Sequence, residues 1–413
     1  MAKFKNEVGW WKQRIKNVYH LANSIYWVAK CGYPAKKLTV IGVTGTDGKT
    51  TTCTLLYEVL KAVGIRVGAI TTVTAKYVNE KNEETEIETG LHTTNPDARR
   101  LQPILKEMTD AGVTHVVLEV TAHGLDQYRV WGCNIKIGVL TNITRDHLDD
   151  FLDMKRYIGA KLKLFKGVQY AVLNKDDPAY EQIRQGCDEK CTVMPYTKSE
   201  WTELSPALAG DYNRYNLAAV TTVAEILKVP EDAVRKSAKN FLGVSGRREE
   251  VKAGQNFRTV VDFAHTPNAL KSVLTQLRSD LSKSGRLIAV FGCTGERDKG
   301  KRPLMGEIAA ELADVIVITS DDIRSENQDE IAKQIISGMA DPELRIKNGT
   351  LVTENDRRKA IGLAVKMAKA GDIVLLAGKG HEKSILIGKT EQPWSDVDEA
   401  KAEIKMRLKG KKS

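Results

Sequence analysis

Residues 43–52 read VTGTDGKTTT and directly follow the apolar run LTVIG at residues 38–42. Glycines between a strand and a helix let backbone N–H groups approach phosphate oxygens, and the helix N-terminus adds a favourable dipole. The widespread spacing G-x-x-x-x-G-K-[ST] needs glycine at position 43, where this chain has valine. A tight turn alone would explain the glycines but not the Lys-Thr pair, so the stretch predicts a phosphate cradle. The residues that we expect to contact a nucleotide here are Gly45, Thr46, Asp47, Gly48, Lys49, Thr50 and Thr51.

Composition places the chain among soluble globular proteins. It has 413 residues, of which 42% are hydrophobic and 28% charged, enough for two or three domains. No apolar run is long enough to span a bilayer, and no secretory signal is evident. Six cysteines are scattered along the chain, and only Cys187 and Cys191 lie close together. We therefore expect reduced thiols and a cytoplasmic location.

The net charge of +10 is compatible with nucleic acid, a membrane surface or anionic small substrates. Basic residues are spread along the whole chain and do not interleave with aromatic ones, so a nucleic-acid partner is not expected. Residues 1–37 read as a helix, with Lys12, Arg14, Lys16 and Lys30 as basic positions. Its apolar face comprises Trp10, Trp11, Ile15, Val18, Leu21, Ala22, Ile25 and Val28. We expect this helix to pack on the protein body, with a membrane surface as the alternative partner.

Strand-like and helix-like runs alternate from Leu38 onward. Runs such as LTVIGV, THVVLEVT and IKIGVLTNI read as buried strands. A helix is expected over residues 95–112, with Asn95 as its cap and Pro96 at its first position. A break falls near residues 243–247, and four more strands follow it, each with a helix-like segment. The expected fold is α/β: a helical lead (1–37), a central P-loop domain with a mostly parallel sheet (38–243), and a Rossmann-like domain (244–413).

The spelling of the P-loop resembles that of the Mur ligase family, and the likeness extends over most of the chain. The matching stretches are HTTNPDA (92–98), LEVTAHGLDQYRV (118–130), TNITRDHLDDF (141–151), YIGAKLKLF (157–165), GDYNRYN (210–216), GRREEV (246–251), VDFAHTPNAL (261–270), FGCTGERDKGKRPLMGEIA (291–309), TSDDIRSE (319–326) and AGKGHE (377–382). Within the family the chain looks most similar to the MurE type. That resemblance implies an ATP-dependent ligase that activates a carboxylate as an acyl phosphate and joins it to an amino acid in peptidoglycan synthesis. It also implies two Mg2+ ions, a monomer and small-molecule substrates.

Site residues follow from the resemblance, and some also from the residues themselves. Glu119 ends the buried run VVLE, and a carboxylate at that end of a parallel strand lies at the usual ligand crevice, with a surface group as the less favoured alternative. By resemblance the metal ligands are Thr50, Glu119, His147 and Lys161, and the catalytic residues are Lys49, Lys161, His147 and Glu119. Lys161 reads as a solvated helix lysine, but the family carbamylates it. Further nucleotide contacts are expected from Asn142, Asn213, Asn216, Arg247 and Asp262, and acceptor contacts from Thr93, Thr94, Thr121, His123, Arg129 and His265.

The incoming amino acid is expected to meet Arg297, Asp321, Asp322, Arg324, Gly378 and Glu382. MurE enzymes that use meso-diaminopimelate carry D-N-P-R where this chain has DDIR at 321–324. Arg324 can pair bidentately with a carboxylate, and Glu382 suits an ammonium, with the charge of Asp322 adding to that attraction. The resemblance thus favours diaminopimelate, with L-Lys as the alternative.

The P-loop lies so early that we expect the chain to lack the family's N-terminal UDP-binding domain. Two further hypotheses therefore stay open. One is a Mur-fold ligase with another carboxylate acceptor, such as a UDP-free muropeptide or a folylpolyglutamate-like substrate. The other is a non-catalytic Mur-like partner, against which the intact Lys49, Glu119, His147 and Lys161 argue.

Overall fold

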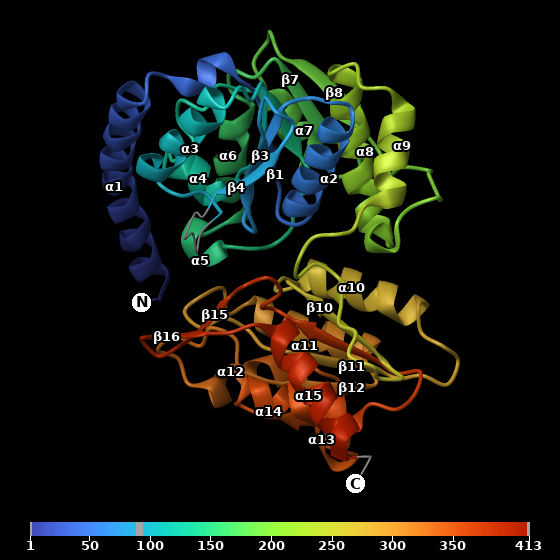
Figure 1. Cartoon of the computed structure of the whole chain (residues 1–413). Helices are drawn as coiled ribbons and strands as arrows, with labels where there is room; N and C mark the ends of the chain where they lie inside the picture. Colours follow the sequence, from blue (N-terminus) through green and yellow to red (C-terminus); the bar gives the residue numbers. More distant parts are fainter. Residues whose placement is uncertain (1, 88–93, 411–413) are drawn as a thin grey trace. The chain divides into compact units, whose positions relative to one another are not determined.

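The computed structural model describes the backbone of residues 2–87 and 94–410, with side chains from residue 11 onward. The chain forms two compact units, Met1–Leu242 and Gly243–Ser413 (Figure 1). No helix within the described ranges has the length and apolar character that crossing a bilayer requires.

The first unit is built on an eight-stranded sheet in the order β4-β3-β2-β5-β1-β6-β7-β8. Its strands are β1 Thr39–Thr44, β2 Val67–Ile70, β3 Ala75–Val78, β4 Glu84–Ile87, β5 His115–Glu119, β6 Ile135–Leu140, β7 Tyr170–Asn174 and β8 Thr192–Tyr196. Only β3 pairs antiparallel with its neighbours, so the prediction of a mostly parallel sheet is confirmed. Because β1, β5 and β6 are parallel neighbours, the loops after all three meet at one edge of the sheet.

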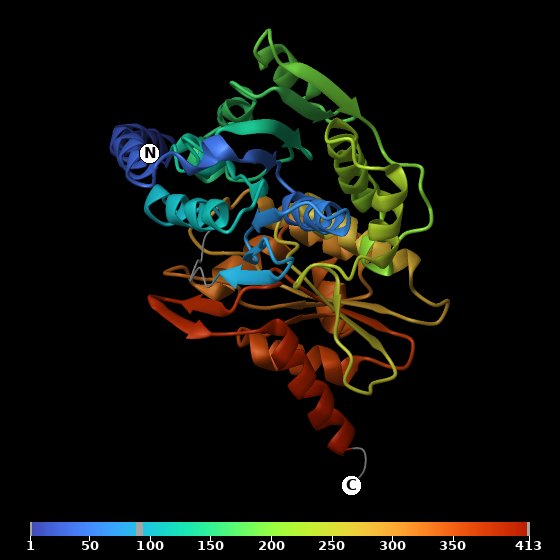
Figure 2. The same cartoon turned by 45° about the horizontal axis from the view of Figure 1, so that its top comes forward.

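Helices cover both faces of this sheet. They are α1 Ala2–Lys30, η1 Pro34–Lys37, α2 Lys49–Ala62, α3 Ala98–Asp110, α4 Ala122–Asp126, α5 Leu148–Phe151, α6 Met154–Leu162, η2 Lys163–Phe165, α7 Tyr180–Gly186, η3 Pro206–Leu208, α8 Asp211–Ile226 and α9 Glu231–Asn240. Figure 2 shows α8 and α9 side by side, and both contact α2. Apolar side chains of α3, α4 and α6 join the sheet in one hydrophobic core.

One local expectation, the start of the helix after Asn95, was wrong. Helix α3 begins at Ala98 rather than at Pro96, because the Asn95 amide is used elsewhere: it donates to the carbonyl of Glu119 (2.7 Å) and accepts from the backbone N–H of Thr121 (2.8 Å). Within the expected helical lead (1–37), helix α1 ends at Lys30 and the 3-10 helix η1 follows at Pro34–Lys37. Helix α1 packs on α3, as expected, and the side chains that it buries are Asn17, Ser24 and Val28.

The second unit is a six-stranded sheet in the order β13-β12-β11-β14-β10-β9, parallel except for β9, plus a separate hairpin. Its elements are β9 Glu249–Glu250, β10 Arg258–Asp262, α10 Pro267–Ser279, β11 Leu287–Phe291, α11 Lys301–Leu312, β12 Val315–Ile318, α12 Gln328–Ile336, α13 Pro342–Lys347, β13 Leu351–Thr353, α14 Arg357–Met367, β14 Ile373–Ala377, β15 Ser384–Ile387, β16 Thr390–Pro393 and α15 Asp396–Gly410. Alternate residues of β11 face opposite sides, with Ala289 packing toward α10, α11 and α12 and Val290 toward α14 and α15. The Rossmann-like α/β prediction is confirmed.

Candidate active site

The turn between β1 and α2 has the backbone shape of a phosphate cradle. Gly48 has a φ of 83°, in the left-handed region that favours glycine. A Cβ there would collide with the amide oxygen of Asn216, and a Cβ at Gly45 would collide with the hydroxyl of Thr141. Helix α2 begins at Lys49, so its unpaired backbone N–H groups lie at this turn. The residues present therefore fit a nucleotide phosphate.

The loop after β6 braces this cradle from the neighbouring strand. The Asn142 side chain accepts a hydrogen bond from the backbone N–H of Asp47 (2.9 Å) and donates to its carbonyl (3.1 Å). Thr141 Oγ1 donates to the same carbonyl at 2.7 Å. Thr46 Oγ1 lies 3.2 Å from the hydroxyl of buried Tyr157. Asn142 thus contacts the cradle itself, and its expected contact with nucleotide stays a prediction.

Glu119 lies beside the cradle at the end of β5, where its side chain is almost fully buried. Thr50 Oγ1 donates to both of its carboxylate oxygens (3.1 and 3.0 Å). The backbone N–H and hydroxyl of Thr72 donate to the same carboxylate, each at 3.0 Å. A carboxylate and two hydroxyls at one point form a hard oxygen donor set, which fits Mg2+.

Two lysines converge on the carbonyl of Gly45. Lys49 Nζ donates to it (3.1 Å) and to the carbonyl of Thr46 (2.7 Å), and Lys161 Nζ donates to it at 2.7 Å. Lys161 is 1% exposed, so its description as a solvated helix lysine is wrong. Burial, followed by repulsion from Lys49, lowers the pKa of Lys161 well below its ordinary value. The lowered pKa favours the neutral form of this amine over its ammonium form.

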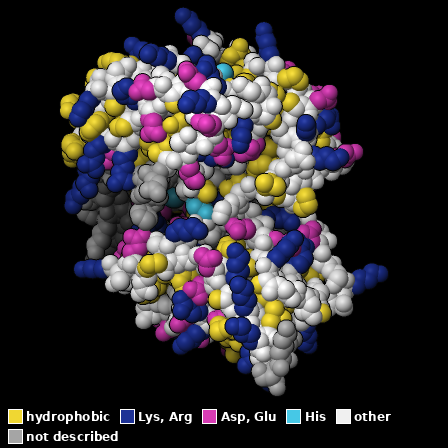
Figure 3. Space-filling model, in the orientation of Figure 1, with side chains coloured by type: hydrophobic (Ala, Val, Ile, Leu, Met, Phe, Trp, Pro, Cys, Tyr) yellow, Lys and Arg dark blue, Asp and Glu magenta, His cyan; other side chains and the backbone are white. Residues whose placement is uncertain are grey.

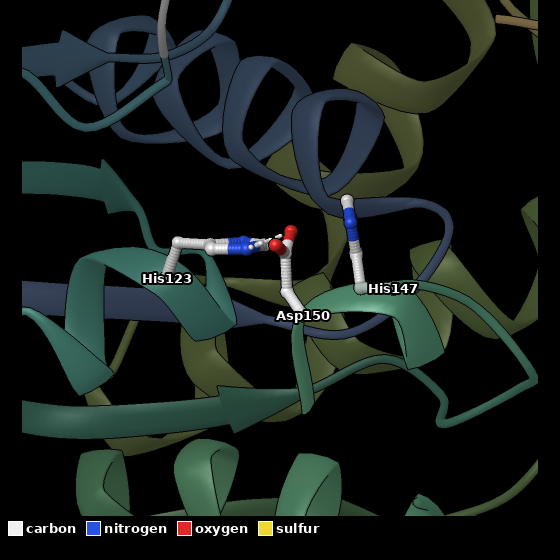
Figure 4. A group of neighbouring side chains, drawn as sticks. All are labelled: His123, His147 and Asp150. Carbon is white, nitrogen blue, oxygen red and sulfur yellow. Dashed lines mark hydrogen bonds and ion pairs between the residues drawn. The ribbon is translucent and has the colours of Figure 1, made fainter. Parts of the chain in front are cut away.

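His123, His147 and Asp150 form a second group with metal-ligating character (Figure 4). His123 Nε2 lies 2.8 Å from Asp150 Oδ2, and the two imidazoles meet edge to face at 4.8 Å between centroids. One ligand atom from each of the three residues lies within 4.8 Å of the others. His147 is in the left-handed region (φ 54°) where α5 begins, which turns its ring toward His123. Two imidazoles and a carboxylate can hold a divalent cation.

Of the residues expected to contact the acceptor, Thr94, Thr121, His123 and Arg129 lie near the same edge of the first unit's sheet. Thr94 shares a hydrogen bond with Thr72 (2.8 Å), and Thr121 Oγ1 donates to Asn95 Oδ1 (2.9 Å). Arg129 donates to the carbonyl of Asn95 at 2.8 Å. Thr93 lies outside the described residues.

Asn213 and Asn216 are both buried on α8. Asn216 Nδ2 donates to Asn213 Oδ1 (3.0 Å), and Asn213 donates to the carbonyl of Ala209 (3.1 Å). Asn213 therefore contacts the turn that precedes α8, while the amide oxygen of Asn216 borders Gly48. Helix α8 brings this amide to the cradle.

In the second unit, Asp262 lies buried where β10 ends. Its carboxylate accepts from the backbone N–H groups of Arg248 and Ala264, both at 2.8 Å. Burial raises its pKa, while the charge of Arg247 opposes the rise. The Arg247 guanidinium stacks on the ring of Phe263 at 4.4 Å.

His265 packs against Phe263, two residues earlier in the same loop. Its ring lies 4.5 Å from that of Phe263, and its Nδ1 lies 2.8 Å from the carbonyl of the same residue. The ring of His381 lies 5.0 Å from Phe263. Three predicted residues, Arg247, Asp262 and His265, therefore gather around the end of β10.

The loops after β12 and β14 bring together three acids and one lysine. Lys379, 1% exposed, donates to Asp322 Oδ1 (2.8 Å) and pairs with Glu382 Oε2 (2.6 Å). Desolvation and the charges of Asp321 and Asp322 raise the pKa of Glu382 to about 7, with Lys379 opposing them. Although burial acts to raise it, the pKa of Asp321 is held below its usual value by Lys379 and Arg357.

Asp322 carries charge at this site, where it raises the pKa of Glu382 although Lys379 partly offsets it, and its attraction for a ligand ammonium stays a prediction. Its Oδ1 also accepts from the backbone N–H of Leu386 at 2.9 Å, so the carboxylate ties the loop to hairpin β15–β16 and is balanced by Lys379. Arg324 follows with a φ of 53°, and its Nε is buried without a hydrogen-bond partner among the described residues. Arg297 is half-buried in the loop after β11. At Gly378 (φ 111°), a Cβ would approach Asp321 Oδ2 to 2.9 Å.

Two family models match the chain: the Mur ligase middle domain at residues 43–201, and the Mur ligase, glutamate ligase domain at residues 246–380. UDP-N-acetylmuramoyl-L-alanyl-D-glutamate–2,6-diaminopimelate ligase of Thermosynechococcus vestitus is 37% identical over 406 residues, 91% of this chain and 79% of that protein. The chain belongs to the Mur ligase family. A relative of the same name from Bacillus cereus is 34% identical and covers 96% of this chain and 83% of its own length.

Solved structures agree with this placement of the Mur ligase. A structure of UDP-N-acetylmuramoyl-L-alanyl-D-glutamate–2,6-diaminopimelate ligase matches with a TM-score of 0.59 at 29% identity, over 96% of this chain and 83% of that one. Folylpolyglutamate synthase of Mycobacterium tuberculosis matches with a TM-score of 0.68 at 17% identity, over 87% of this chain and 92% of that one. The second likeness concerns the fold alone. The chain is thus an ATP-dependent ligase of the Mur fold.

Sequence reasoning missed several residues of this Mur ligase site. Thr72 stands two residues after the end of β2, at the same sheet edge as Glu119. Its place just after a predicted strand is the feature of the sequence that could have identified it. Asp150 is part of a quoted motif, but nothing in the sequence shows that it reaches His123. Lys379 stands inside AGKGHE, and its burial between carboxylates appears only in three dimensions.

Proposed function

We propose that this Mur ligase uses ATP to join 2,6-diaminopimelate to UDP-N-acetylmuramoyl-L-alanyl-D-glutamate, as a monomer in the cytoplasm. The names of relatives at 34–37% identity support both substrates. The choice of diaminopimelate rests on the charged residues in the loops after β12 and β14. There the buried Arg324 Nε has no hydrogen-bond partner among the described residues. Arg324 suits the distal carboxylate and Glu382 the distal ammonium of a diamino diacid.

The cradle supports the first half-reaction. Lys49 and the first backbone N–H groups of α2 bind the phosphates of ATP. An oxygen of the acceptor carboxylate attacks the γ-phosphorus, and the bond to the β-phosphate oxygen breaks, giving an acyl phosphate and ADP. Lys49 offsets negative charge that develops on the transferred group.

Thr50 and Glu119 are the residues that would hold Mg2+ here, and His147 with His123 and Asp150 form a candidate second position. Bound Mg2+ neutralises phosphate charge and polarises the phosphoryl group. We further propose that Lys161 adds to carbon dioxide through its neutral amine and loses a proton, leaving a carbamate. That step is supported by the burial of Lys161 and its lowered pKa.

The second half-reaction needs the amine of the incoming amino acid in reach of the acyl carbon. That amine attacks, a tetrahedral intermediate forms, and inorganic phosphate leaves as the amide is made. Residues of the second unit then have a positioning task. Arg324 and Glu382 bind the far end of diaminopimelate, and Lys379 keeps Glu382 and Asp322 in place.

The test is a turnover assay with ATP, Mg2+, the UDP-linked dipeptide and a panel of amino acids. Phosphate release and the mass of the product are measured. We expect product with diaminopimelate and little or none with L-lysine. A parallel arm offers a UDP-free muropeptide and a folate acceptor with glutamate. Turnover only in that arm would replace the proposal by a Mur-fold ligase with a different acceptor. No turnover in either arm would favour a non-catalytic partner.

A further inference from the structure

Helix α1 carries a row of large apolar side chains on its solvent side. Trp11, Ile15, Val18, Tyr19, Ile25 and Tyr26 are between 46% and 74% exposed. Their spacing of three, four and seven residues places them on one face of the helix, together with Ala22. We call this set of six side chains the α1 stripe. A surface helix of a globular protein normally turns such a face inward.

The opposite side of α1, which packs on the protein, combines polar side chains with buried Val28 and half-buried Leu21 and Trp27. Asn17 and Ser24 are buried, and Asn17 Nδ2 donates to the carbonyl of Asp126 (2.9 Å). Ser24 Oγ donates to the carbonyl of Tyr128 at 2.8 Å. Arg14 adds an ion pair with Asp126 at 2.8 Å. These directional contacts fix the rotation of the helix, so the α1 stripe faces away from the unit it belongs to.

The charges around the α1 stripe have one sign. Residues 11–30 contain Lys12, Arg14, Lys16 and Lys30 and no aspartate or glutamate. Lys12 and Lys16 are exposed and lie along one border of the stripe. Figure 3 shows yellow and dark-blue side chains along the edge where α1 lies in Figure 1. The surface is thus apolar and aromatic at its centre and cationic at its border.

We propose that α1 docks on the surface of an anionic lipid bilayer, with the α1 stripe at the acyl boundary and the lysines at the phosphates. Tryptophan and tyrosine are the side chains that favour this interface, and lysines beside an apolar face add attraction to anionic lipids. A second copy of the chain is the poorer occupant, because pairing two α1 helices would bring their like-charged borders together. The helix lies on the bilayer and does not cross it, in keeping with the absence of any spanning helix among the described residues.

The test is flotation of the full-length protein with vesicles of pure phosphatidylcholine or of phosphatidylcholine with phosphatidylglycerol. We expect binding to the anionic vesicles only, weakening as salt is raised. The variant I15E/V18E places two charges in the α1 stripe and should bind at least about tenfold more weakly. The matched control is L344E/I346E on α13, where two aliphatic side chains that are more than half exposed receive the same charges. It should bind like the unchanged protein.

Three results would overturn the proposal: no binding to anionic vesicles, equal binding by I15E/V18E, or equal loss in L344E/I346E. Self-association measured by light scattering, if abolished by I15E/V18E while vesicles are ignored, would assign the α1 stripe to a second copy instead. Circular dichroism verifies that both variants keep their helices. Because flotation needs no turnover, the result is independent of which amino acid the ligase uses.

Discussion

Replacing Lys379 by methionine tests the acidic site of the second unit. Methionine keeps the length of the side chain and removes the charge. Lys379 is 1% exposed and contacts Asp322 and Glu382 at 2.8 and 2.6 Å. The variant leaves these two carboxylates without their shared cation.

The expected loss of stability depends on pH. Losing the charged hydrogen bond to Asp322 costs about 2 kcal/mol. Glu382 has a pKa raised to about 7, so its stability contribution is complete at low pH and falls as pH rises to that value. Without Lys379 the pKa of Glu382 rises further. The free energy of unfolding then keeps falling above pH 7, by about 1.4 kcal/mol per pH unit. Because Glu382 is 37% exposed, screening reduces the extra loss at pH 8.5 to about 1 kcal/mol.

The assay is urea denaturation, in which hydrogen exchange of the backbone amides of β14, the strand that precedes Lys379, reports the unfolding of the second unit. We expect K379M to lose about 2 kcal/mol near pH 6 and about 3 kcal/mol near pH 8.5. K383M, at an exposed neighbouring lysine, is the control and should change stability by less than about 0.5 kcal/mol. A K379M loss that is the same at both pH values, or smaller at the higher one, would refute the coupling between Lys379 and Glu382.

Four further predictions concern the reaction. G48A should raise the KM for ATP at least about tenfold, because its Cβ would collide with Asn216; an unchanged KM would contradict the cradle geometry. R324A should raise the KM for diaminopimelate by about 10- to 100-fold and leave that for ATP unchanged, as measured in initial rates. E119Q should raise the Mg2+ concentration needed for half-maximal rate, and an unchanged Mg2+ titration would remove Glu119 from the metal site. As pH rises through about 7, Glu382 ionises and the KM for diaminopimelate should fall, a dependence that E382Q should abolish.

Much of the fold followed from local patterns. Buried runs such as VVLE and the glycine-rich turn at residues 45–48 predicted the succession of strands, turns and helices along the chain. Parallel strands then bring their ends to one edge, which is why Glu119 and Thr50 meet although 69 residues separate them. These features depend on periodicity and turn chemistry, which a sequence carries directly.

Other features depended on contacts between distant residues. The spacing of α1 predicted an apolar face, but most of that face is exposed because Asn17 and Ser24 hydrogen-bond to the protein, while Val28 of the same face is buried. The sequence predicted Asn95 as a helix cap, but its side chain hydrogen-bonds to Glu119 at the end of β5 instead. The burial of Lys161 and the balance between Lys379 and Asp322 are likewise set by the surrounding structure and leave no local signature.

The central claim is that an acceptor carboxylate is activated by phosphoryl transfer and then joined to diaminopimelate. The most direct measurement uses UDP-N-acetylmuramoyl-L-alanyl-D-glutamate with 18O in the reacting carboxylate. Since a carboxylate oxygen attacks phosphorus and leaves with it, each product molecule should release inorganic phosphate carrying one 18O atom, and only when diaminopimelate is present. Phosphate free of 18O, or labelled phosphate without any amide product, would contradict the account.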